Sequence, residues 1–463
     1  MVPSTESSTK KIHRMKEDRI SKLPQNLQET ILGFLPIQDA VKSSILSTKW
    51  RHCWTMIPNL IFDFEFVDRI MSKLDGIRNP ELRAHKLVSV INKVLLLHNG
   101  PILKFSLTFP AVDNTEYGFS KEIIHEYIDQ WIPLFARKGI KQLTLDESSK
   151  LEDFRRHNLS SLDLTHLTLL RVWFPYTPTL GKFTCLTNLE LVDATSNFGK
   201  SIFHCPVLEK LTLIICEGLF PNKFCAPNLK RLVQIYREIT SEYSLVGLKN
   251  LSEYSFMLAG HPVTQAKTSN VAKVLGGVHK IKRVSLAKYS LKYLAAGGSP
   301  CRLYKPLSYL ETLNVFDMNF FDLSEISCLL CLIRSAPNLC KLHIEADSFP
   351  EKKDSEEDLK NYCIDDSEDC TINHLEIVTF SKFHHLRAEV ELVRFLLGHS
   401  PSLKIMSING YERINRYDES TVADDMLQHS RDSSRAKLRR LDCPDVYDEF
   451  DGDLYWEDMD IPV

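Results

Sequence analysis

The sequence predicts an α/β chain in which a short helical module precedes a long, curved parallel sheet with outer helices. Three observations predict this fold class. Apolar residues follow helical spacing near the N-terminus, an apolar pattern recurs through most of the chain at intervals of 21 to 38 residues, and a strand–helix–strand pattern lies near residue 400. With 463 residues, the chain is long enough for two or three domains.

The first element is a module of three short helices in residues 23–54. Apolar residues recur every fourth position along the first helix, and two prolines bound it: Pro24, Leu27, Ile31, Leu35 and Pro36. The second and third helices are indicated by the spacing of Val41, Ser44, Ile45, Ser47, Trp50 and Trp54. About thirty residues offer too little core for this many apolar side chains, so we expect part of the surface to bind a partner.

This module resembles the F-box over residues 18–58. The resemblance depends on Leu23-Pro24, Ile31-Leu32, Leu35-Pro36, Leu46-Ser47 and Trp50-Arg51, which follow the order and spacing of that family. It implies that the module binds the Skp-type adaptor of a cullin–RING ubiquitin ligase. The adaptor contacts that the resemblance implies are Leu23, Pro24, Ile31, Leu35, Val41 and Trp50.

The middle of the chain is a repeat array. The pattern apolar-x-x-apolar-x-apolar begins at Ile102, Ile140, Leu164, Leu186, Leu208, Leu251, Ile281, Leu310, Leu339, Ile372 and Leu403. A twelfth copy, at Leu229, is broken by Gln234 at its last position. This pattern is typical of leucine-rich repeats, each with one short strand and a return segment. A single repeat cannot bury its apolar face, so we expect neighbours to stack into a curved parallel sheet.

Copies from Leu251 onward are longer, and this predicts outer helices, for example in residues 270–275 and 323–335. Residues 351–369 are mostly acidic and predict a solvated loop. After that loop a helical stripe is predicted, ended by Gly398; the stripe consists of Val390, Val393, Leu396 and Leu397.

This last region resembles the FBD domain, a strand–helix–strand element. The resemblance depends on Leu375, Glu391, Phe395-Leu396-Leu397 and Ser400-Pro401-Ser402-Leu403. Together with the F-box, it identifies a resemblance to plant F-box/FBD/LRR-repeat proteins. The expected organisation is a flexible polar tail (1–17), an F-box (18–58), leucine-rich repeats (100–370), an FBD-like domain (371–440) and an acidic tail (441–463).

Composition and motifs exclude several classes of function. The net charge of −3 argues against a general nucleic-acid binder, and no apolar run approaches the length that crosses a bilayer. The sequence has no phosphate-binding, nucleophile-elbow or zinc-protease motif, so we expect no enzyme activity, cofactor or metal. Without a secretory signal, the twelve cysteines are expected to be reduced thiols, those of the Cys328–Cys331 pair in the core. The chain is expected to be soluble, in the nucleus, the cytoplasm or both.

The third position of each repeat predicts a surface for a target protein, because it lies beside core residues on a strand and points to the opposite face. These positions are Lys104, Gln142, His166, Asn188, Lys210, Arg231, Glu253, Arg283, Thr312, Lys341, His374 and Ile405. Five of the twelve are basic, and one is acidic. We expect Lys210, Arg231, Arg283 and Lys341 to attract an acidic or phosphorylated segment; ordinary solvated cations are the alternative.

The resemblance implies a substrate-recognition subunit of a Skp–cullin–F-box ubiquitin ligase. It would bind the adaptor, and through it the cullin and RING proteins, while the repeats hold an unknown protein substrate. Two alternatives remain: an interaction scaffold outside ubiquitination, or a small-molecule-dependent F-box sensor. A compact pocket lined by cations and aromatic residues would favour the sensor. The basic residues at the third repeat positions form what we call the basic column. The acidic tail, which carries Tyr447, Phe450, Tyr455 and Trp456, could cover this column or simply solubilise the chain.

Overall fold

The computed structural model divides the chain into two compact units. Residues 1–149 with 156–164 form unit 1, and residues 150–155 with 165–463 form unit 2. The residues that the structure describes are 23–46, 48, 50–74, 76–109, 121–146, 159–174, 183–196, 203–220, 224–239, 244–245, 247–260, 270–348, 363–364, 371–410 and 437–439. The N-terminal basic tail, the acidic C-terminal tail and nearly all of the acidic loop at 351–369 lie outside these ranges.

Unit 1 begins with the predicted helical module. Its elements are α1 (Gln25–Gly33), α2 (Ile37–Lys42), and the 3-10 helices η1 (Ser43–Ile45) and η2 (Trp50–Met56). Pro24 and Pro36 are the residues just before α1 and α2. The prediction that α1 continues to Pro36 is wrong: it ends at Gly33. The reason is that Gly33 is a weak helix former, and Pro36 excludes the helical conformation from Leu35.

The rest of unit 1 places three parallel strands among longer helices. In chain order these elements are β1 (Asn59–Phe62), α3 (Phe64–Ser72), α4 (Pro80–Leu97), β2 (Lys104–Leu107), α5 (Lys121–Lys138), β3 (Gln142–Asp146) and η4 (Leu159–Ser161). The strand β1 and the helices α3 and α4 were not predicted. β1 pairs with β2, and β2 with β3. Asp63 and Asn79 cap α3 and α4 by accepting backbone hydrogen bonds.

Phe105 is at the centre of an aromatic core in unit 1. Its ring centroid lies 5.6 Å from that of Phe62, 4.7 Å from Phe135 and 5.7 Å from Trp131. The indole nitrogen of Trp131 donates a hydrogen bond to Asn92 Oδ1 at 2.7 Å. A buried indole therefore has the polar partner that it needs, and the core connects both flanking helices, α4 and α5, to the strands.

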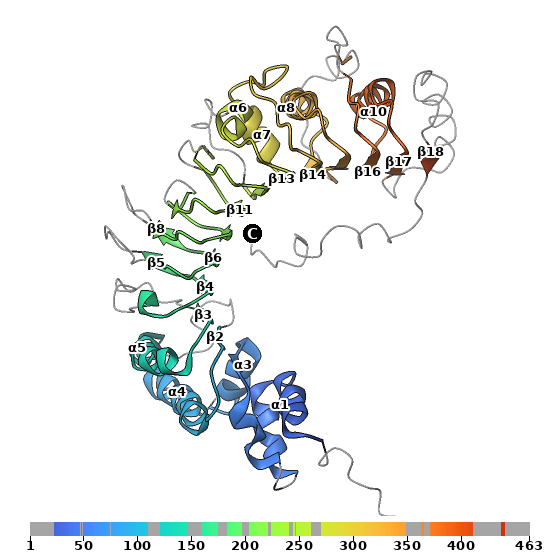
Figure 1. The fold of residues 1–463 in the computed structure, drawn as a ribbon. Coiled ribbons are helices and arrows are strands. Elements are labelled where there is room, and N and C mark those ends of the chain that lie inside the picture. Colours follow the sequence, from blue (N-terminus) through green and yellow to red (C-terminus); the bar gives the residue numbers. More distant parts are fainter. Residues whose placement is uncertain are drawn as a thin grey trace, which may run out of the picture. The chain divides into compact units, whose positions relative to one another are not determined.

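Unit 2 is a row of parallel strands, as the repeats predict (Figure 1). They are β4 (His166–Leu170), β6 (Asn188–Val192), β9 (Lys210–Ile214), β11 (Arg231–Tyr236), β12 (Glu253–Leu258), β13 (Arg283–Lys288), β14 (Thr312–Met318), β15 (Lys341–Ala346), β16 (Ile377–Phe383), β17 (Ile405–Gly410) and β18 (Lys437–Arg439). Neighbouring strands pair in that order. In nearly every repeat the first, fourth and sixth positions are buried, for example Leu208, Leu211 and Leu213; in the repeat at Leu403 the sixth residue, Ile408, is half-buried. This stacking gives one continuous core.

Two kinds of return segment explain the two repeat lengths. In the shorter repeats, small parallel ladders join β5 (Trp173–Phe174) to β7 (Thr195–Ser196) and β8 (Phe203–His204) to β10 (Phe224–Cys225). The longer repeats contain α6 (Val271–Leu275), α7 (Ser290–Ala295), α8 (Leu323–Arg334) and α10 (Arg387–His399). The helices predicted at 270–275 and 323–335 are confirmed. Cys328 and Cys331 are buried in α8, as their apolar setting predicts.

Six strands of unit 2 share a backbone turn at the same repeat position, near or just after the last residue of the strand, a feature that the sequence pattern did not indicate. Six residues at the eighth repeat position have φ between 50° and 57°: Arg171, Asp193, Ile215, Lys288, Asp317 and Lys382. The backbone N–H groups of the first three donate to carbonyls of the next strand at 2.6–2.7 Å. Residues other than glycine rarely adopt this backbone conformation, so its recurrence indicates that the stacking of the repeats imposes it.

Three details of the predicted repeats differ in the structure. Ile377, and not His374, lies opposite Lys341, so the repeat predicted at Ile372 begins three residues later. The broken copy still forms β11, because the amide of Gln234 donates to the hydroxyl of Tyr236 at 2.8 Å. The helix α10 continues through Gly398 to His399. The strand–helix–strand prediction itself is confirmed by β16, α10 and β17.

The described residues also limit other types of site. No helix among them is both long and apolar enough to cross a membrane. They contain no group of three His, Cys, Asp or Glu side chains placed to hold a metal ion.

Candidate partner-binding surfaces

The helix α1 separates its residues into a buried side and an exposed apolar side. Gln28 and Leu32 are buried, whereas Leu27 is 46% exposed and Ile31 is 43% exposed. Exposed apolar residues continue past the helix, where Phe34 is 85% exposed. A helix that faced only its own core would not leave this side open to water.

Gln28 fixes α1 to the rest of the module. Its side-chain nitrogen donates to the Leu23 carbonyl at 3.1 Å, and its side-chain oxygen accepts from the Cys53 thiol at 3.3 Å. Burial raises the pKa of Cys53, and the charge of Glu29 raises it further. The thiol is therefore a structural donor in its neutral form, which orients α1 with its apolar side outward.

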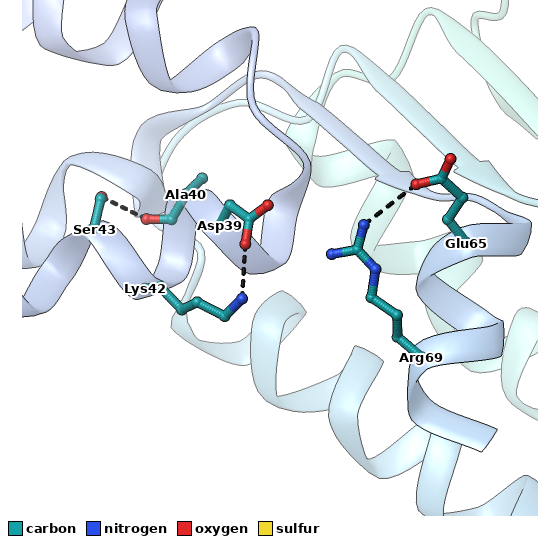
Figure 2. Close-up of polar contacts among 6 residues, drawn as sticks. All are labelled: Asp39, Ala40, Lys42, Ser43, Glu65 and Arg69. Carbon is teal, nitrogen blue, oxygen red and sulfur yellow. Dashed lines mark hydrogen bonds and ion pairs between the residues drawn. The ribbon is translucent and has the colours of Figure 1, made fainter. Parts of the chain in front are cut away.

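The α2–η1 turn is closed by short polar contacts, which Figure 2 shows beside the first turns of α3. Lys42 Nζ lies 2.7 Å from Asp39 Oδ1, and Ser43 Oγ donates to the Ala40 carbonyl at 2.6 Å. The hydrogen bond from Lys42 lowers the pKa of Asp39. Just beyond this turn Ile45 is 84% exposed, and Leu46 is also exposed.

We define the apolar face as Leu27, Ile31, Phe34, Leu35, Ile45 and Leu46. These are six of the fifteen large apolar residues that are exposed in the described part of the chain, and they fall within twenty residues of sequence. Scattered exposed apolar residues are ordinary, but this concentration in one short stretch makes the module the candidate interaction surface of unit 1.

The six adaptor contacts that the F-box resemblance implies differ in their exposure to solvent. Pro24, Ile31 and Leu35 are exposed, and Leu23 and Val41 are half-buried. Trp50 is 4% exposed and packs inside the module with Trp54, so it supports the surface from within. Sequence analysis did not select Phe34, Ile45 and Leu46 as contacts. Leu46 belongs to the matching pattern, and the helix end that exposes Phe34 is indicated by Gly33 and Pro36.

The predicted basic column is a cross-strand row on the repeat sheet. Strand register aligns Asn188, Lys210, Arg231, Glu253, Arg283, Thr312 and Lys341. Ile377 and Ile405 continue the row beyond Lys341, and Lys437 on β18 follows Ile405 in register. Lys104 and Gln142 are paired with each other in unit 1. Within unit 2, the structure thus brings together the four predicted substrate-binding cations on one side of the sheet.

One carboxylate partly neutralises this row. Glu253 is between Arg231 and Arg283 in register, and its Oε2 lies 3.4 Å from Arg231 Nε. The pair is half-buried, with the Arg231 side chain 20% exposed and that of Glu253 38% exposed. Any acidic ligand would have to compete with Glu253 for Arg231.

The FBD-like region is organised around two glutamates of α10. Glu391 accepts from both Arg387 and Arg394 at 3.0 Å. Glu389 is fully buried, and its Oε2 accepts the backbone N–H groups of His384 and Leu386 at 3.0 and 2.9 Å. Burial raises the pKa of Glu389 to about 8. Glu391 is one of the residues that carry the FBD resemblance, and its two ion pairs give it a structural role.

Comparison with known proteins agrees with this arrangement. The F-box domain model matches residues 20–62, and the FBD model matches residues 369–408. The Arabidopsis thaliana F-box/FBD/LRR-repeat protein At1g13570 is 31% identical over 436 residues, which cover 91% of this chain and 98% of that protein. The chain belongs to the plant F-box/FBD/LRR-repeat family.

Two further comparisons show lower identity. The putative F-box/FBD/LRR-repeat protein At1g66290 of Arabidopsis thaliana is 24% identical, with 85% of this chain and 87% of that protein covered. An internalin crystal structure from Listeria monocytogenes covers 69% of this chain and 95% of its own at 12% identity, with a TM-score of 0.26. A structural similarity with so low a TM-score supports no conclusion about this chain. Membership in the F-box/FBD/LRR-repeat family therefore depends on the sequence relatives.

Proposed function

We propose that this chain is the substrate-recognition subunit of a Skp–cullin–F-box ubiquitin ligase. The exposed apolar face beside the buried Gln28–Cys53 link is the observation that supports this most strongly. Skp-type adaptor binding is what an F-box domain implies. The apolar face has the chemistry for such a contact, because burying it on a partner removes large side chains from water.

In this proposal the chain has no chemistry of its own. The adaptor, and through it the cullin and RING proteins, would bring a ubiquitin-conjugating enzyme to a substrate held by the repeats. Ubiquitin transfer to the substrate would become faster through proximity and orientation. An interaction scaffold outside ubiquitination is the alternative, and adaptor binding separates the two.

The adaptor test uses the full chain and a purified Skp-type adaptor. We expect Ile31→Ala combined with Leu35→Ala to weaken binding at least about thirtyfold, at about 1 kcal/mol for each anchor. The Leu23→Ala/Pro24→Ala variant should also weaken it. A matched control is Leu96→Ala/Leu97→Ala, which removes exposed leucines at the end of α4. Failure of the folded native chain to bind the adaptor would favour the scaffold.

We also propose that the basic column contacts an acidic or phosphorylated segment of the substrate. The support is the alignment of Lys210, Arg231, Arg283 and Lys341 on one side of the sheet. Reversing Lys210, Arg231 and Arg283 to glutamate should reduce the proteins captured from a plant extract while adaptor binding stays intact. An unchanged set of captured proteins would contradict this role.

A further inference from the structure

A second cationic surface of unit 2 surrounds a pocket. Its volume is about 780 Å³, within the range of roughly 300–1,000 Å³ typical of small-molecule sites. Lysines from three separate segments line it: Lys249 before β12, Lys273 and Lys280 before β13, and Lys305 before β14. Because the strands are parallel, these segments all lie at the edge of the sheet where the strands begin.

The backbone around the pocket is held by hydrogen bonds. Leu303 N–H donates to the buried Ser335 hydroxyl at 2.8 Å. At Lys273, which also lines the pocket, Ser244 Oγ donates to the backbone carbonyl at 2.9 Å, and Asn270 caps α6 by accepting from the Lys273 N–H. The walls are therefore formed before any ligand arrives, which lowers the entropic cost of binding.

The charges in this pocket differ from those on the rest of unit 2. Several other lysines of unit 2 pair with carboxylates of adjacent repeats, as in Lys230–Glu209 at 2.7 Å and Lys404–Glu376 at 2.8 Å. Among the described residues that line the pocket, none is acidic. The ammonium of Lys280 instead donates to the neutral amide oxygen of Asn250 at 3.2 Å. Ammonium groups that line one concavity repel each other, and a polyanion would reduce that repulsion.

We propose that this pocket binds a small molecule that carries two or more phosphate groups. Lysine is a point-charge ligand for phosphate, and the pocket contains no arginine for planar, bidentate contact with a carboxylate. The lysines surround a single concavity, which fits a compact ligand better than an extended peptide. Leu303 and the 97% exposed Tyr304 give the same pocket an apolar part, where a ring or hydrocarbon body of the ligand has room.

The test measures binding of inorganic tripolyphosphate to the full chain by calorimetry at low salt. We expect Lys249→Gln/Lys280→Gln/Lys305→Gln to weaken binding about thirtyfold, or about threefold for each exposed lysine. The matched control is Lys230→Gln/Lys282→Gln/Lys404→Gln, which removes the same charge from lysines that pair with glutamates. We expect that control to lose less than about threefold. Thermal melting checks that both variants are folded.

Several outcomes would overturn the proposal. They are no binding by the native chain, equal losses in the two triple variants, or monophosphate that binds as tightly as tripolyphosphate. A phosphorylated peptide that binds these lysines more tightly than tripolyphosphate would replace the proposed ligand class with a peptide. Adaptor binding, measured separately, should be unchanged in both variants, so failure here and failure of the ligase-subunit function remain distinguishable.

Discussion

The F-box and the repeat sheet treat their apolar residues differently. In the F-box, Ile31, Phe34 and Ile45 remain exposed, although the helices that carry them are ordered by buried polar contacts. In the repeats, core positions such as Leu286 and Leu342 are almost completely buried, and charged side chains occupy the strand starts. The F-box therefore leaves apolar side chains exposed, whereas the repeats bury theirs and present charge. In our proposal the same residue type serves binding in the F-box and folding in the repeats.

Deleting one large apolar side chain in each region should give the largest contrast. Leu286→Ala, in the core of β13, is expected to lower the free energy of unfolding by about 3 kcal/mol, because it loses buried area and leaves a cavity. Ile45→Ala should change it by less than about 0.5 kcal/mol and instead weaken adaptor binding. Denaturant unfolding of both variants checks this. Equal destabilisation would mean that Ile45 belongs to the folding core.

The buried carboxyl of the repeat region predicts an effect of pH that is similar in size. The pKa of Glu389 rises from its ordinary 4.5 to about 8 on folding, so the folded chain binds more protons between these values. Its contribution is complete below pH 4.5 and is lost as pH rises through 8, with a loss of about 3 kcal/mol between pH 5 and 8. The free energy of unfolding, measured with urea at pH 5 and at pH 8, should fall less between the two pH values for Glu389→Gln than for the native chain. An equal fall in both proteins would contradict the raised pKa.

The smallest of these effects is expected at the buried amide of the F-box. Gln28→Ala removes the hydrogen bonds that the side chain makes with the Leu23 carbonyl and the Cys53 thiol, which should cost about 2 kcal/mol. Gln25→Ala is a matched control on the same helix, because its contact with Glu29 is exposed and should contribute less than about 0.5 kcal/mol. If the two variants unfold alike, the polar link does not orient α1.

Which predictions succeeded depends on how local their physical cause is. Core spacing such as Leu208, Leu211 and Leu213 specifies a strand by its own periodicity, and the repeat array was therefore predictable. Ile372 and Leu375 both offer an apolar start, and only pairing with β15 selects the second. The exposed side of α1 could be predicted from Leu27 and Ile31. The burial of Trp50 could not, because it depends on packing with other parts of the module.

The sequence by itself determined the type and order of the modules, because apolar periodicity, prolines and the F-box pattern specify local structure within short segments of the chain. Only the tertiary structure decided which groups from separate segments of the chain meet. It placed Glu253 between two arginines, gave Gln28 its two partners, and brought Lys249, Lys280 and Lys305 around one pocket from segments about thirty residues apart. Stacking sets these distances, and no local pattern encodes them.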